Sequence, residues 1–260
     1  MSHNILEIKD IVKKFGGLTA VNNITTSITR GEIRALIGPN GSGKTTLLNI
    51  ISGIYTPDGG TIMFEDNPIH KLPPYQIAWR GISRTFQNIR LFGNLSVIKN
   101  VMIAGHRKGK TGILRAIIFS KQTQEEEQRL KKNAEECLEF VGLEVDPAIK
   151  ASSLSYGQRR LLEVARALAV EPRLILLDET AAGLNPQEKQ HLISIIRKIR
   201  DKGITILFVE HDMNMVMAVS DQISVLNFGR KIAEGSPDEI KANSEVLEAY
   251  LGKEEYAEVE

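Results

Sequence analysis

The chain has 260 residues, a formal net charge of +1, 25% charged residues and 42% apolar residues. This balance is ordinary for a globular protein and argues against a general nucleic-acid binder, which is usually clearly basic. The single cysteine, Cys137, excludes an internal disulfide and fits a reducing compartment. We expect no signal peptide, and no apolar run approaches the ~20 residues that span a bilayer.

The first part of the chain is predicted to be rich in strands. Short runs of alternating apolar and polar residues at 5–15, 20–29 and 31–38 predict strands joined by glycine-containing turns. Further along, the pattern predicts a helix at 44–53 that ends at a glycine, a strand at 59–64 and a turn-rich segment at 73–81.

Residues 95–150 change character. The pattern predicts a helix at 96–105, a basic glycine-rich loop at 106–112, a short apolar piece at 113–119 and a charged helix at 123–142. Because no strand pattern occurs there, we interpret this stretch as a helical insertion in an α/β domain.

The alternation of strands and helices returns after residue 154. The expected elements are an amphipathic helix from Ser155, a strand at 173–179, a helix at 186–203, a strand at 204–212 and a hairpin at 221–235. The two strands are continuously apolar, as expected for a parallel sheet that is buried on both faces. The acidic end, residues 253–260, predicts a frayed tail.

The run GPNGSGKTT matches a phosphate-binding loop, since it follows a predicted strand and begins a predicted helix. Backbone N–H groups and the helix N-terminus supply positive potential. Lys44 suits the β- and γ-phosphates, and the Thr45 hydroxyl suits Mg²⁺. The predicted ATP-binding residues of this loop are Gly38, Pro39, Asn40, Gly41, Ser42, Gly43, Lys44, Thr45 and Thr46.

Two of the predicted buried strands end in residues that suit ATP hydrolysis. Asp178 ends the first, where its carboxylate can hold Mg²⁺, and Glu179 can orient or deprotonate an attacking water. His211 ends the second strand, at the edge of a parallel sheet where ligands bind, and can hydrogen-bond the γ-phosphate. The residues therefore predict a P-loop nucleoside triphosphatase, and a kinase of the same fold stays an alternative.

The helix start at Ser155 suits a second phosphate group. A serine N-cap followed by Gly157 offers free N–H groups, a hydroxyl and a positive helix dipole. The phosphate-binding loop already serves the chain's own nucleotide. We therefore expect this helix start to close on the nucleotide of another subunit, in a head-to-tail dimer that buries two ATP molecules.

The motifs GPNGSGKTT, RTFQ, LSYGQ, LILLDE and FVEHD together resemble the ABC ATPases in order and spacing, along nearly the whole chain. The resemblance implies a P-loop α/β core with an N-terminal antiparallel β subdomain. It also implies one domain over residues 1–260, with a helical subdomain at about 95–168 inserted in the core and a tail at about 240–260.

The resemblance also implies roles for single residues. Phe15 matches the aromatic residue that stacks on adenine. Gln87 matches the residue that contacts Mg²⁺ and water and links the site to membrane subunits. Together the implied catalytic residues are Glu179, His211, Lys44 and Gln87, and the implied metal ligands are Thr45, Gln87 and Asp178. The residues implied to contact the ATP of the partner subunit are Ser155, Gly157, Gln158 and Asn185.

Three residues depart from the family's usual pattern. Tyr156 replaces a glycine, and we expect its side chain to point outward. Asn185 stands where many members have aspartate. Thr180 replaces a proline and restores an N–H group, so we expect a changed turn after Glu179 that affects catalytic rate rather than nucleotide binding.

The subfamily is indicated by stretches such as ISRTFQNIRLFGNL, DETAAGLNPQE and EVLEAYLG, which are similar to ATP-binding subunits of branched-chain amino-acid importers. The resemblance implies Mg²⁺-ATP as substrate and a place on the cytoplasmic face of the cell membrane. The implied partners are a second, related ATPase, two integral-membrane permeases and an extracytoplasmic substrate-binding protein, without nucleic acid. The alternatives are a urea or amide importer, a lipopolysaccharide exporter, a non-transport ABC ATPase and a P-loop kinase.

Two further features have competing interpretations. Residues 106–121 join basic to apolar residues, and we favour packing on the helical subdomain over membrane contact because the apolar piece is short. Trp79 lies shortly before Gln87, and we expect it in the core rather than at a permease interface.

Overall fold

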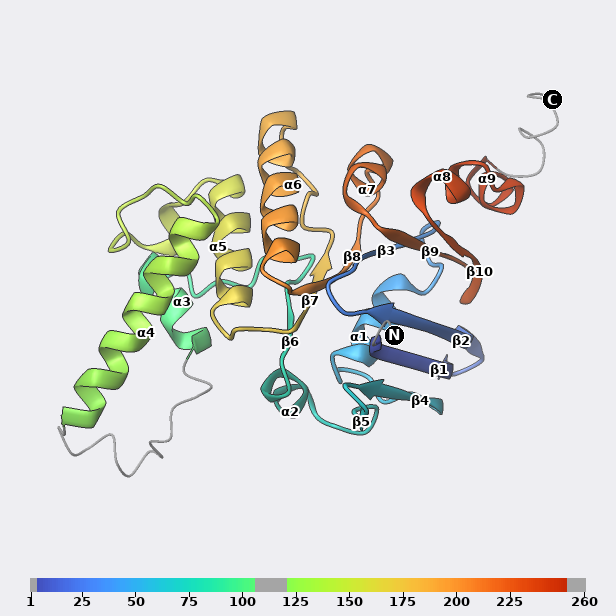
Figure 1. The fold of residues 1–260 in the computed structure, drawn as a ribbon, viewed down its shortest axis with the longest axis horizontal. Coiled ribbons are helices and arrows are strands. Elements are labelled where there is room, and N and C mark those ends of the chain that lie inside the picture. The colour runs from blue at the N-terminus through green and yellow to red at the C-terminus, as the bar shows by residue number, and fades with distance from the viewer. Residues whose placement is uncertain (1–3, 106–120, 252–260) are drawn as a thin grey trace.

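A computed structural model describes residues 4–105 and 121–251 of the chain (Figure 1). The strands are β1 (Asn4–Phe15), β2 (Leu18–Thr29), β3 (Ile33–Ile37), β4 (Gly59–Phe64), β5 (Asn67–Pro68), β6 (Ile82–Arg84), β7 (Leu174–Asp178), β8 (Thr205–Val209), β9 (Gln222–Asn227) and β10 (Arg230–Gly235). The helices are α1 (Lys44–Ile51), α2 (Pro74–Trp79), α3 (Val97–Gly105), α4 (Lys121–Phe140), α5 (Tyr156–Leu168), α6 (Pro186–Asp201), α7 (Met213–Val219), α8 (Pro237–Lys241) and α9 (Ser244–Leu251).

The larger sheet has the strand order β10-β9-β3-β8-β7-β6, and only β10 runs antiparallel to its neighbour. Its central strands are buried on both faces, because their apolar side chains point alternately to one face of the sheet and to the other. In β7, Leu174 and Leu176 pack with α1, whereas Ile175 and Leu177 pack with α5, α6 and α7. The continuous apolar pattern of the sequence therefore predicted this sheet correctly.

The smaller sheet, β2-β1-β4-β5, is antiparallel and covers the other side of α1. The helix thus lies between the two sheets, and its Leu47, Leu48, Ile50 and Ile51 are buried there. Gly53 follows with φ of 75°, a left-handed conformation that ends the helix where the sequence predicts.

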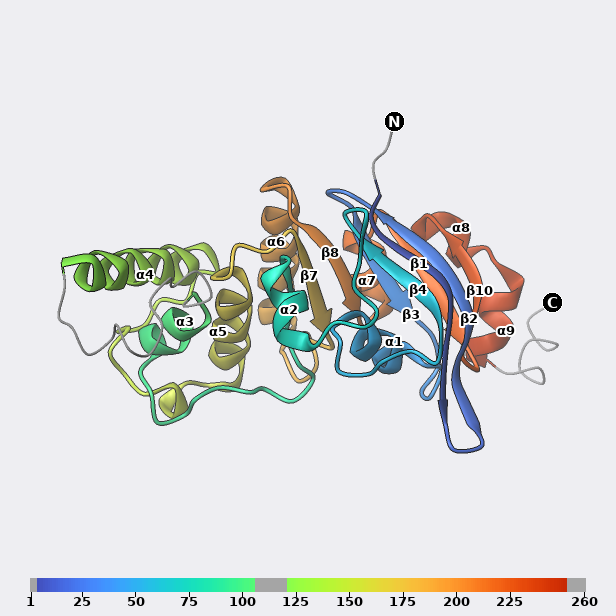
Figure 2. The same ribbon diagram turned by 90° about the horizontal axis from the view of Figure 1, so that it is seen from below.

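Helices α3, α4 and α5 pack together at the end of the molecule opposite the antiparallel sheet (Figure 2). Val101, Leu138 and Leu162 belong to their shared core. Over residues 95–105 and 121–150 the structure shows helices, turns and one isolated bridge, Ser96–Lys150, but no strand. The predicted loop and apolar piece at 106–119 and the tail at 253–260 lie outside the described residues.

The structure differs from the sequence expectations at residues 73–84. The predicted turn-rich segment contains helix α2, and the next three residues form the edge strand β6, which exists through its pairing with β7. The expectation of a core Trp79 is wrong, because its side chain is 57% exposed and stands edge-on to Tyr75. Helix α2 is short and buries only Ile77, so Trp79 falls on its open side.

The end of the described chain is also helical, since α9 lies within the tail that the sequence assigns to residues from about 240 on, and α8 lies at the start of that tail. Both helices pack against β10. Across the described ranges, none of the helices combines the length and the apolar character that crossing a membrane requires.

Candidate functional site

The phosphate-binding loop connects β3 to α1, and its backbone requires glycine at two positions. Gly38 and Gly43 have φ of 146° and 103°. A Cβ atom on Gly38 would lie 2.0 Å from the carbonyl oxygen of Leu226, and one on Gly43 would lie 2.6 Å from that of Ala20. No other residue fits such contacts, so neighbouring backbone fixes the shape of the loop.

Lys44 is the first residue of α1 and is buried. Its Nζ atom donates hydrogen bonds to the carbonyl oxygens of Gly38 and Pro39, at 2.8 and 2.9 Å. Burial lowers the pKa of the Lys44 ammonium, and the negative charges of Glu179 and Asp178 oppose this shift. The loop thus holds a partly desolvated cation, which is a strong donor for phosphate oxygens.

An open pocket of about 510 Å³ lies over this loop. Most residues predicted to bind this chain's own nucleotide line it, namely Phe15, Asn40, Gly41, Ser42, Gly43, Lys44, Thr45, Thr46, Gln87, Glu179 and His211. The Phe15 ring is 42% exposed and packs edge-on against Tyr55, with 5.2 Å between ring centroids. Its open face is therefore available for stacking on a base.

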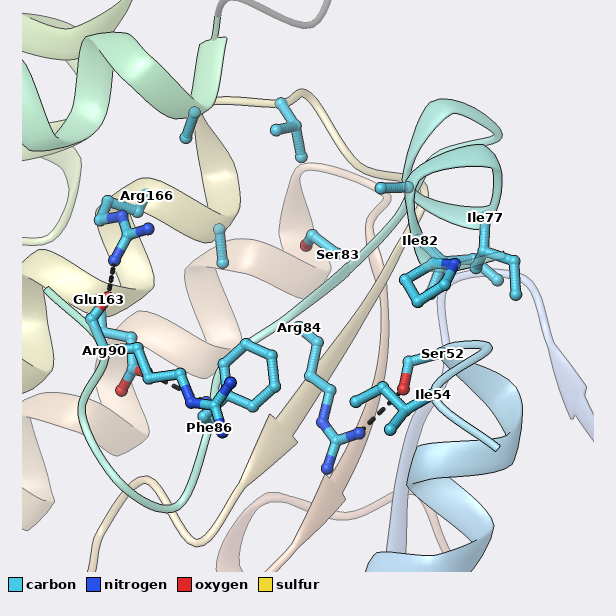
Figure 3. A pocket seen from close by; sticks show the side chains of 15 residues that line it. Ser52, Ile54, Ile77, Ile82, Ser83, Arg84, Phe86, Arg90, Glu163 and Arg166 are labelled. Atoms are coloured by element: carbon cyan, nitrogen blue, oxygen red, sulfur yellow. Dashed lines mark hydrogen bonds between the residues drawn. The ribbon is translucent and has the colours of Figure 1, made fainter. Parts of the chain in front are cut away.

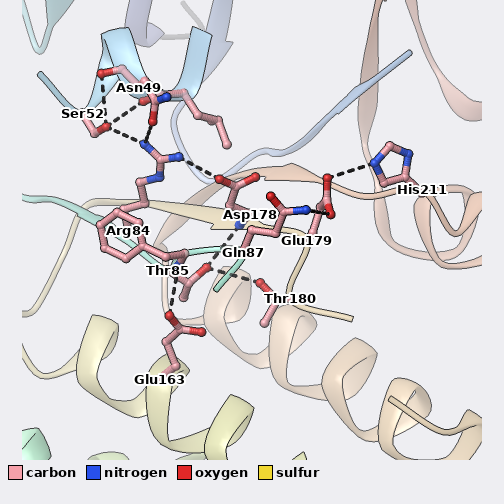
Figure 4. A network of polar contacts seen from close by, with 12 residues as sticks. Asn49, Ser52, Arg84, Thr85, Gln87, Glu163, Asp178, Glu179, Thr180 and His211 are labelled. Atoms are coloured by element: carbon pink, nitrogen blue, oxygen red, sulfur yellow. Dashed lines mark hydrogen bonds and ion pairs between the residues drawn. The ribbon is translucent and has the colours of Figure 1, made fainter. Parts of the chain in front are cut away.

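Glu179, Gln87 and His211 meet at the carboxyl edge of the sheet (Figure 4). Glu179 has a left-handed φ of 49°, which breaks the alternation of β7 and turns the side chain to the pocket. Its Oε2 accepts a hydrogen bond from Gln87 Nε2 at 2.6 Å, and its Oε1 lies 2.9 Å from His211 Nε2. The carboxylate is thus oriented at both oxygens, as a general base requires.

Asp178 ends β7 and is 2% exposed. Its Oδ2 accepts a hydrogen bond from Arg84 Nη2 at 2.7 Å, and Arg84 also donates to Asn49 and Ser52 (Figure 4). The Oδ1 atom of Asp178 is buried and has no hydrogen-bond partner among residues 4–105 and 121–251. Because an unpaired buried carboxylate oxygen is costly, this oxygen is suited to bind a further positively charged partner.

The residues at this place fit a magnesium ion that accompanies a triphosphate. Mg²⁺ takes oxygen ligands, with one or two carboxylates besides water and phosphate. The unpartnered Oδ1 of Asp178 is one such oxygen, and the Thr45 hydroxyl and the Gln87 amide carbonyl are two more. The described residues contain no group of three or more His, Cys, Asp or Glu that could hold a metal ion. Phosphate oxygens of the nucleotide would complete the coordination of Mg²⁺ here.

The turn after Glu179 is held from inside the fold. Thr180 Oγ1 lies 3.3 Å from Thr85 Oγ1, and that same Thr85 oxygen accepts a hydrogen bond from the Asp178 N–H at 3.1 Å. A proline at 180 would lack this hydroxyl, so Thr180 adds a contact between the turn and Thr85, the residue directly after β6. Next along the chain, the Ala181 N–H donates to Glu210 Oε1 at 2.7 Å.

Glu210 is an acid that sequence reasoning missed, because a glutamate inside a polar motif looks solvated. It is 5% exposed. Burial raises the pKa of Glu210 to about 7, against the opposing hydrogen bond from the Ala181 N–H, and the charge of Glu179 raises it further. A carboxyl that titrates near neutrality therefore lies directly before His211.

The residues predicted to face a second subunit lie at two helix starts outside this pocket. Ser155 Oγ accepts from the Gln158 N–H at 3.3 Å, and Gln158 Oε1 accepts from the Ser155 N–H at 2.9 Å. Asn185 and Glu188 cap α6 in the same reciprocal way, at 2.9 Å for both bonds. Each pair is a capping box, so these polar side chains also serve their own helix.

The expectation that Tyr156 points outward is wrong for its hydroxyl and for part of its ring. The side chain is 45% exposed, but the hydroxyl accepts a hydrogen bond from Arg160 Nη2 at 2.8 Å. The ring lies against Gly183, where a Cβ atom would come within 3.0 Å of Cε1. The space left by a glycine lets the ring fold back onto the loop after Glu179.

Sequence reasoning also missed Arg84 and the ion pair of Arg160 with Glu163. Arg84 belongs to the RTFQ motif, but only the pairing of β6 with β7 brings it to Asp178. Arg160 and Glu163 are buried on α5, 3.1 Å apart. Their spacing of three residues on a predicted helix is a signal that could have found this pair.

A second pocket, of about 280 Å³, lies beside the segment that carries Arg84 and Phe86 (Figure 3). It is lined by α2, β6 and α5, and Phe86 and Ile77 form part of its apolar wall. Ser83, Arg84 and Arg166 also line this pocket. The Oγ atom of the serine and the Nε atoms of the two arginines are buried and have no hydrogen-bond partner in the described chain.

Comparisons with known proteins agree with this fold and site. The family model described as "ABC transporter" matches residues 21–182, and the model described as "Branched-chain amino acid ATP-binding cassette transporter" matches residues 230–256. The chain is 42% identical to the high-affinity branched-chain amino acid transport ATP-binding protein LivG of Escherichia coli, over 97% of this chain and 100% of LivG.

Two solved structures show the same architecture. The ADP conformation of MJ1267, an ATP-binding cassette of an ABC transporter, is 34% identical with a TM-score of 0.83, over 97% of this chain and 100% of that one. The dimeric post-hydrolysis state of the ATP-binding cassette MJ0796, bound to ADP and Pi, is 27% identical with a TM-score of 0.76, over 89% and 98%.

The fold and the nucleotide pocket thus define an ABC transporter ATPase, and the chain belongs to that family. It binds ATP and is part of an ABC transporter complex. Within the family it belongs to the branched-chain amino acid subfamily that includes LivG. The family, the fold class and the ATPase activity predicted from the sequence are confirmed.

Proposed function

We propose that this ATPase is the motor of an importer for branched-chain or other hydrophobic amino acids. The observation that carries the proposal is the 42% identity to LivG along 97% of the chain. The nucleotide pocket supports the motor role, because ATP hydrolysis is chemistry that its residues suit. The transported solute would contact the membrane subunits rather than this chain.

In the proposed reaction, Phe15 stacks on adenine and the loop from Gly38 to Thr46 binds the phosphates, with Lys44 at the β- and γ-phosphates. Glu179 deprotonates or orients the attacking water, and His211 stabilises the charge that develops on the γ-phosphate.

Thr45, Gln87 and Asp178 would hold Mg²⁺ beside the phosphates, and the buried unpartnered oxygen of Asp178 supports this assignment. When bound, the ion supplies positive charge at the β- and γ-phosphate oxygens. Arg84 keeps the Asp178 carboxylate in place, since it already binds the other carboxylate oxygen at 2.7 Å.

The partner in the dimer would be a second, related ATPase of different sequence. Ser155, Gly157, Gln158 and Asn185 would contact its ATP, and their position at helix starts outside this chain's own pocket supports the assignment. MJ0796, whose dimeric structure holds ADP and Pi, provides a precedent within the fold. ATP binding would close the dimer, and hydrolysis would open it again.

Of the two proposed integral-membrane permeases, one would bind at the second pocket of this chain. Phe86 lines this pocket and directly precedes Gln87, so a contact there would act on the nucleotide site. The exposed side chain of Trp79, on the neighbouring helix α2, would be covered by a permease in such a contact. In this proposal the chain would lie on the cytoplasmic face of the cell membrane, with an extracytoplasmic substrate-binding protein on the other side and no nucleic-acid partner.

The domain organisation that goes with this function is a single ABC ATPase domain over residues 1–260. A helical subdomain at about 95–168 would be inserted in this domain, and the joint packing of α3, α4 and α5 supports it as one unit.

The decisive experiment is purification of the chain in mild detergent from its own cells, with mass spectrometry of the bound proteins. We expect two multi-span permeases and a second ATPase. Recovery of the chain with soluble nucleic-acid-binding or ribosomal proteins alone would contradict the transport role and leave the ATPase chemistry intact.

A further inference from the structure

Tyr156 contacts two other segments of the chain from the start of α5. Its ring packs against Gly183, in the loop that follows Glu179, where an added Cβ atom would lie 3.0 Å from the ring. Its hydroxyl accepts a hydrogen bond from Arg160 Nη2 at 2.8 Å, and the Arg160 guanidinium carbon lies 5.3 Å from the centre of the ring. The side chain therefore joins the helix start to the loop and to a buried cation.

Arg160 in turn holds the segment that carries Gln87. Its Nη1 donates to the carbonyl oxygen of Phe86 at 3.0 Å, and its Nη2 donates to that of Gln87 at 2.7 Å. Glu163 completes the arrangement, since it accepts from the Phe86 N–H at 3.0 Å and pairs with Arg160 at 3.1 Å. Arg160 is 2% exposed, so little water can replace a contact that it loses.

The contacts continue to the catalytic carboxylate. The Gln87 side chain donates to Glu179 Oε2 at 2.6 Å, and His211 lies at the other oxygen of Glu179. Three hydrogen-bonded steps therefore lead from the Tyr156 hydroxyl through Arg160 and Gln87 to Glu179 of the same chain.

We propose that Tyr156 is a positioning residue that couples the helix start facing the partner's ATP to Gln87 and Glu179 of its own site. The proposal rests on the dimeric function proposed above. Closure of one nucleotide site would then bias the geometry of the general base at the other. A glycine at this position has neither the ring nor the hydroxyl, so it could make neither contact.

The test compares Tyr156→Phe and Tyr156→Gly with the wild-type chain. The first removes the hydroxyl alone, and the second also removes the contact with Gly183. Ser194→Ala serves as the matched control, because its hydroxyl donates to the His191 carbonyl on α6, outside these contacts. Each full-length protein is assayed for Mg-ATP hydrolysis over a range of ATP concentrations, for binding of trinitrophenyl-ATP and for its unfolding temperature.

We expect Tyr156→Phe to lower kcat by about three- to tenfold, the range for one ordinary hydrogen bond, since the hydroxyl acts on Glu179 only through Arg160 and Gln87. Tyr156→Gly should lower it further, and both should reduce the Hill coefficient for ATP. Trinitrophenyl-ATP affinity and KM should stay at the control values, since the pocket that binds nucleotide is untouched. The unfolding temperature should fall by only the few degrees that the lost contact with Arg160 costs.

The possible outcomes distinguish the coupling role of Tyr156 from the proposed ATPase function. If the wild type hydrolyses ATP in a Lys44-dependent way and Tyr156→Phe matches Ser194→Ala, the coupling role is refuted and the ATPase stands. A parallel fall of kcat, nucleotide affinity and unfolding temperature would show a merely structural role and equally refute the coupling. A wild type without Lys44-dependent hydrolysis would overturn the proposed function and the inference together.

Discussion

The nucleotide pocket and the two capped helix starts are built by different means. In the pocket, backbone geometry decides: Gly38 and Gly43 take positive φ values under neighbouring carbonyl oxygens, between a buried strand and a helix. At the starts of α5 and α6, exposed side chains satisfy the N–H groups of their own helix. The pocket therefore tolerates few residues, whereas the helix starts can exchange one polar partner for another.

The strongest way to break this comparison is to neutralise Glu179, the proposed general base, and leave the pocket's shape intact. Glu179→Gln keeps the size of the side chain, so we expect retained trinitrophenyl-ATP binding and a fall in kcat of about 100-fold or more. The ATP-bound dimer should also live longer, which size-exclusion chromatography with ATP would show. Glu135→Gln on the exposed face of α4 is the control, and near-normal turnover of Glu179→Gln would remove Glu179 from this role.

Glu210 offers a pH-dependent test of the interior behind the pocket. Its pKa is about 7 in the folded chain against an ordinary value of 4.5, so folding favours the protonated carboxyl. This contribution is lost as pH rises from the ordinary pKa through about 7, and the shift corresponds to about 3 kcal/mol. Glu210→Gln should lack that loss.

The measurement is urea unfolding of wild type and Glu210→Gln at several values between pH 5 and pH 8. We expect the variant to gain stability relative to wild type as the pH rises. Two curves that stay parallel over the whole range would show that Glu210 titrates as an ordinary exposed acid.

A comparison of two of the three glycines in the loop sharpens the contrast within the pocket itself. Gly41 and Gly43 both have positive φ, but a Cβ atom on Gly41 meets nothing within 4 Å, whereas one on Gly43 would lie 2.6 Å from a carbonyl oxygen. Gly43→Ala should therefore destabilise the chain by about 1–2 kcal/mol more than Gly41→Ala. Chemical denaturation measures both, and equal costs would contradict the role assigned to backbone packing.

The smallest effect tests the helix starts. Ser155→Ala and Asn185→Ala each remove a cap, and Ser236→Ala removes the same kind of cap from α8, away from the site. All three should lose about 1 kcal/mol of stability. Only the first two should also slow ATP hydrolysis, while nucleotide affinity stays unchanged. Equal ATPase rates in all three variants would leave the caps of α5 and α6 with a purely local role.

Local sequence patterns predicted the parts of the molecule that local rules determine. The P-loop depends on glycine spacing, β7 and β8 on unbroken apolar runs, and α5 on its N-cap and apolar face, and all of these appear where the sequence places them. The family resemblance added residues such as Phe15 and Gln87, which no local rule marks, and the structure brings both to the pocket.

The rest depends on contacts between distant parts of the chain. Arg84 meets Asp178 across 94 positions, and Glu210 meets Ala181 across 29. The strand β6 has three residues and exists only through its neighbour β7. Trp79 is exposed because α2 is too short to bury more than one side, which its composition does not reveal.

The backbone hydrogen bonds at the end of β7 also determine how the site responds to heating. The amide hydrogen of Asp178 is donated to Thr85, and that of Glu179 to the carbonyl oxygen of Val209, both within a sheet that is covered on two sides. We expect such amides to exchange with solvent only through openings of the whole sheet. The backbone that carries Asp178 and Glu179 should therefore stay ordered until the sheet opens, and heat inactivation should follow global unfolding instead of a gradual local decay.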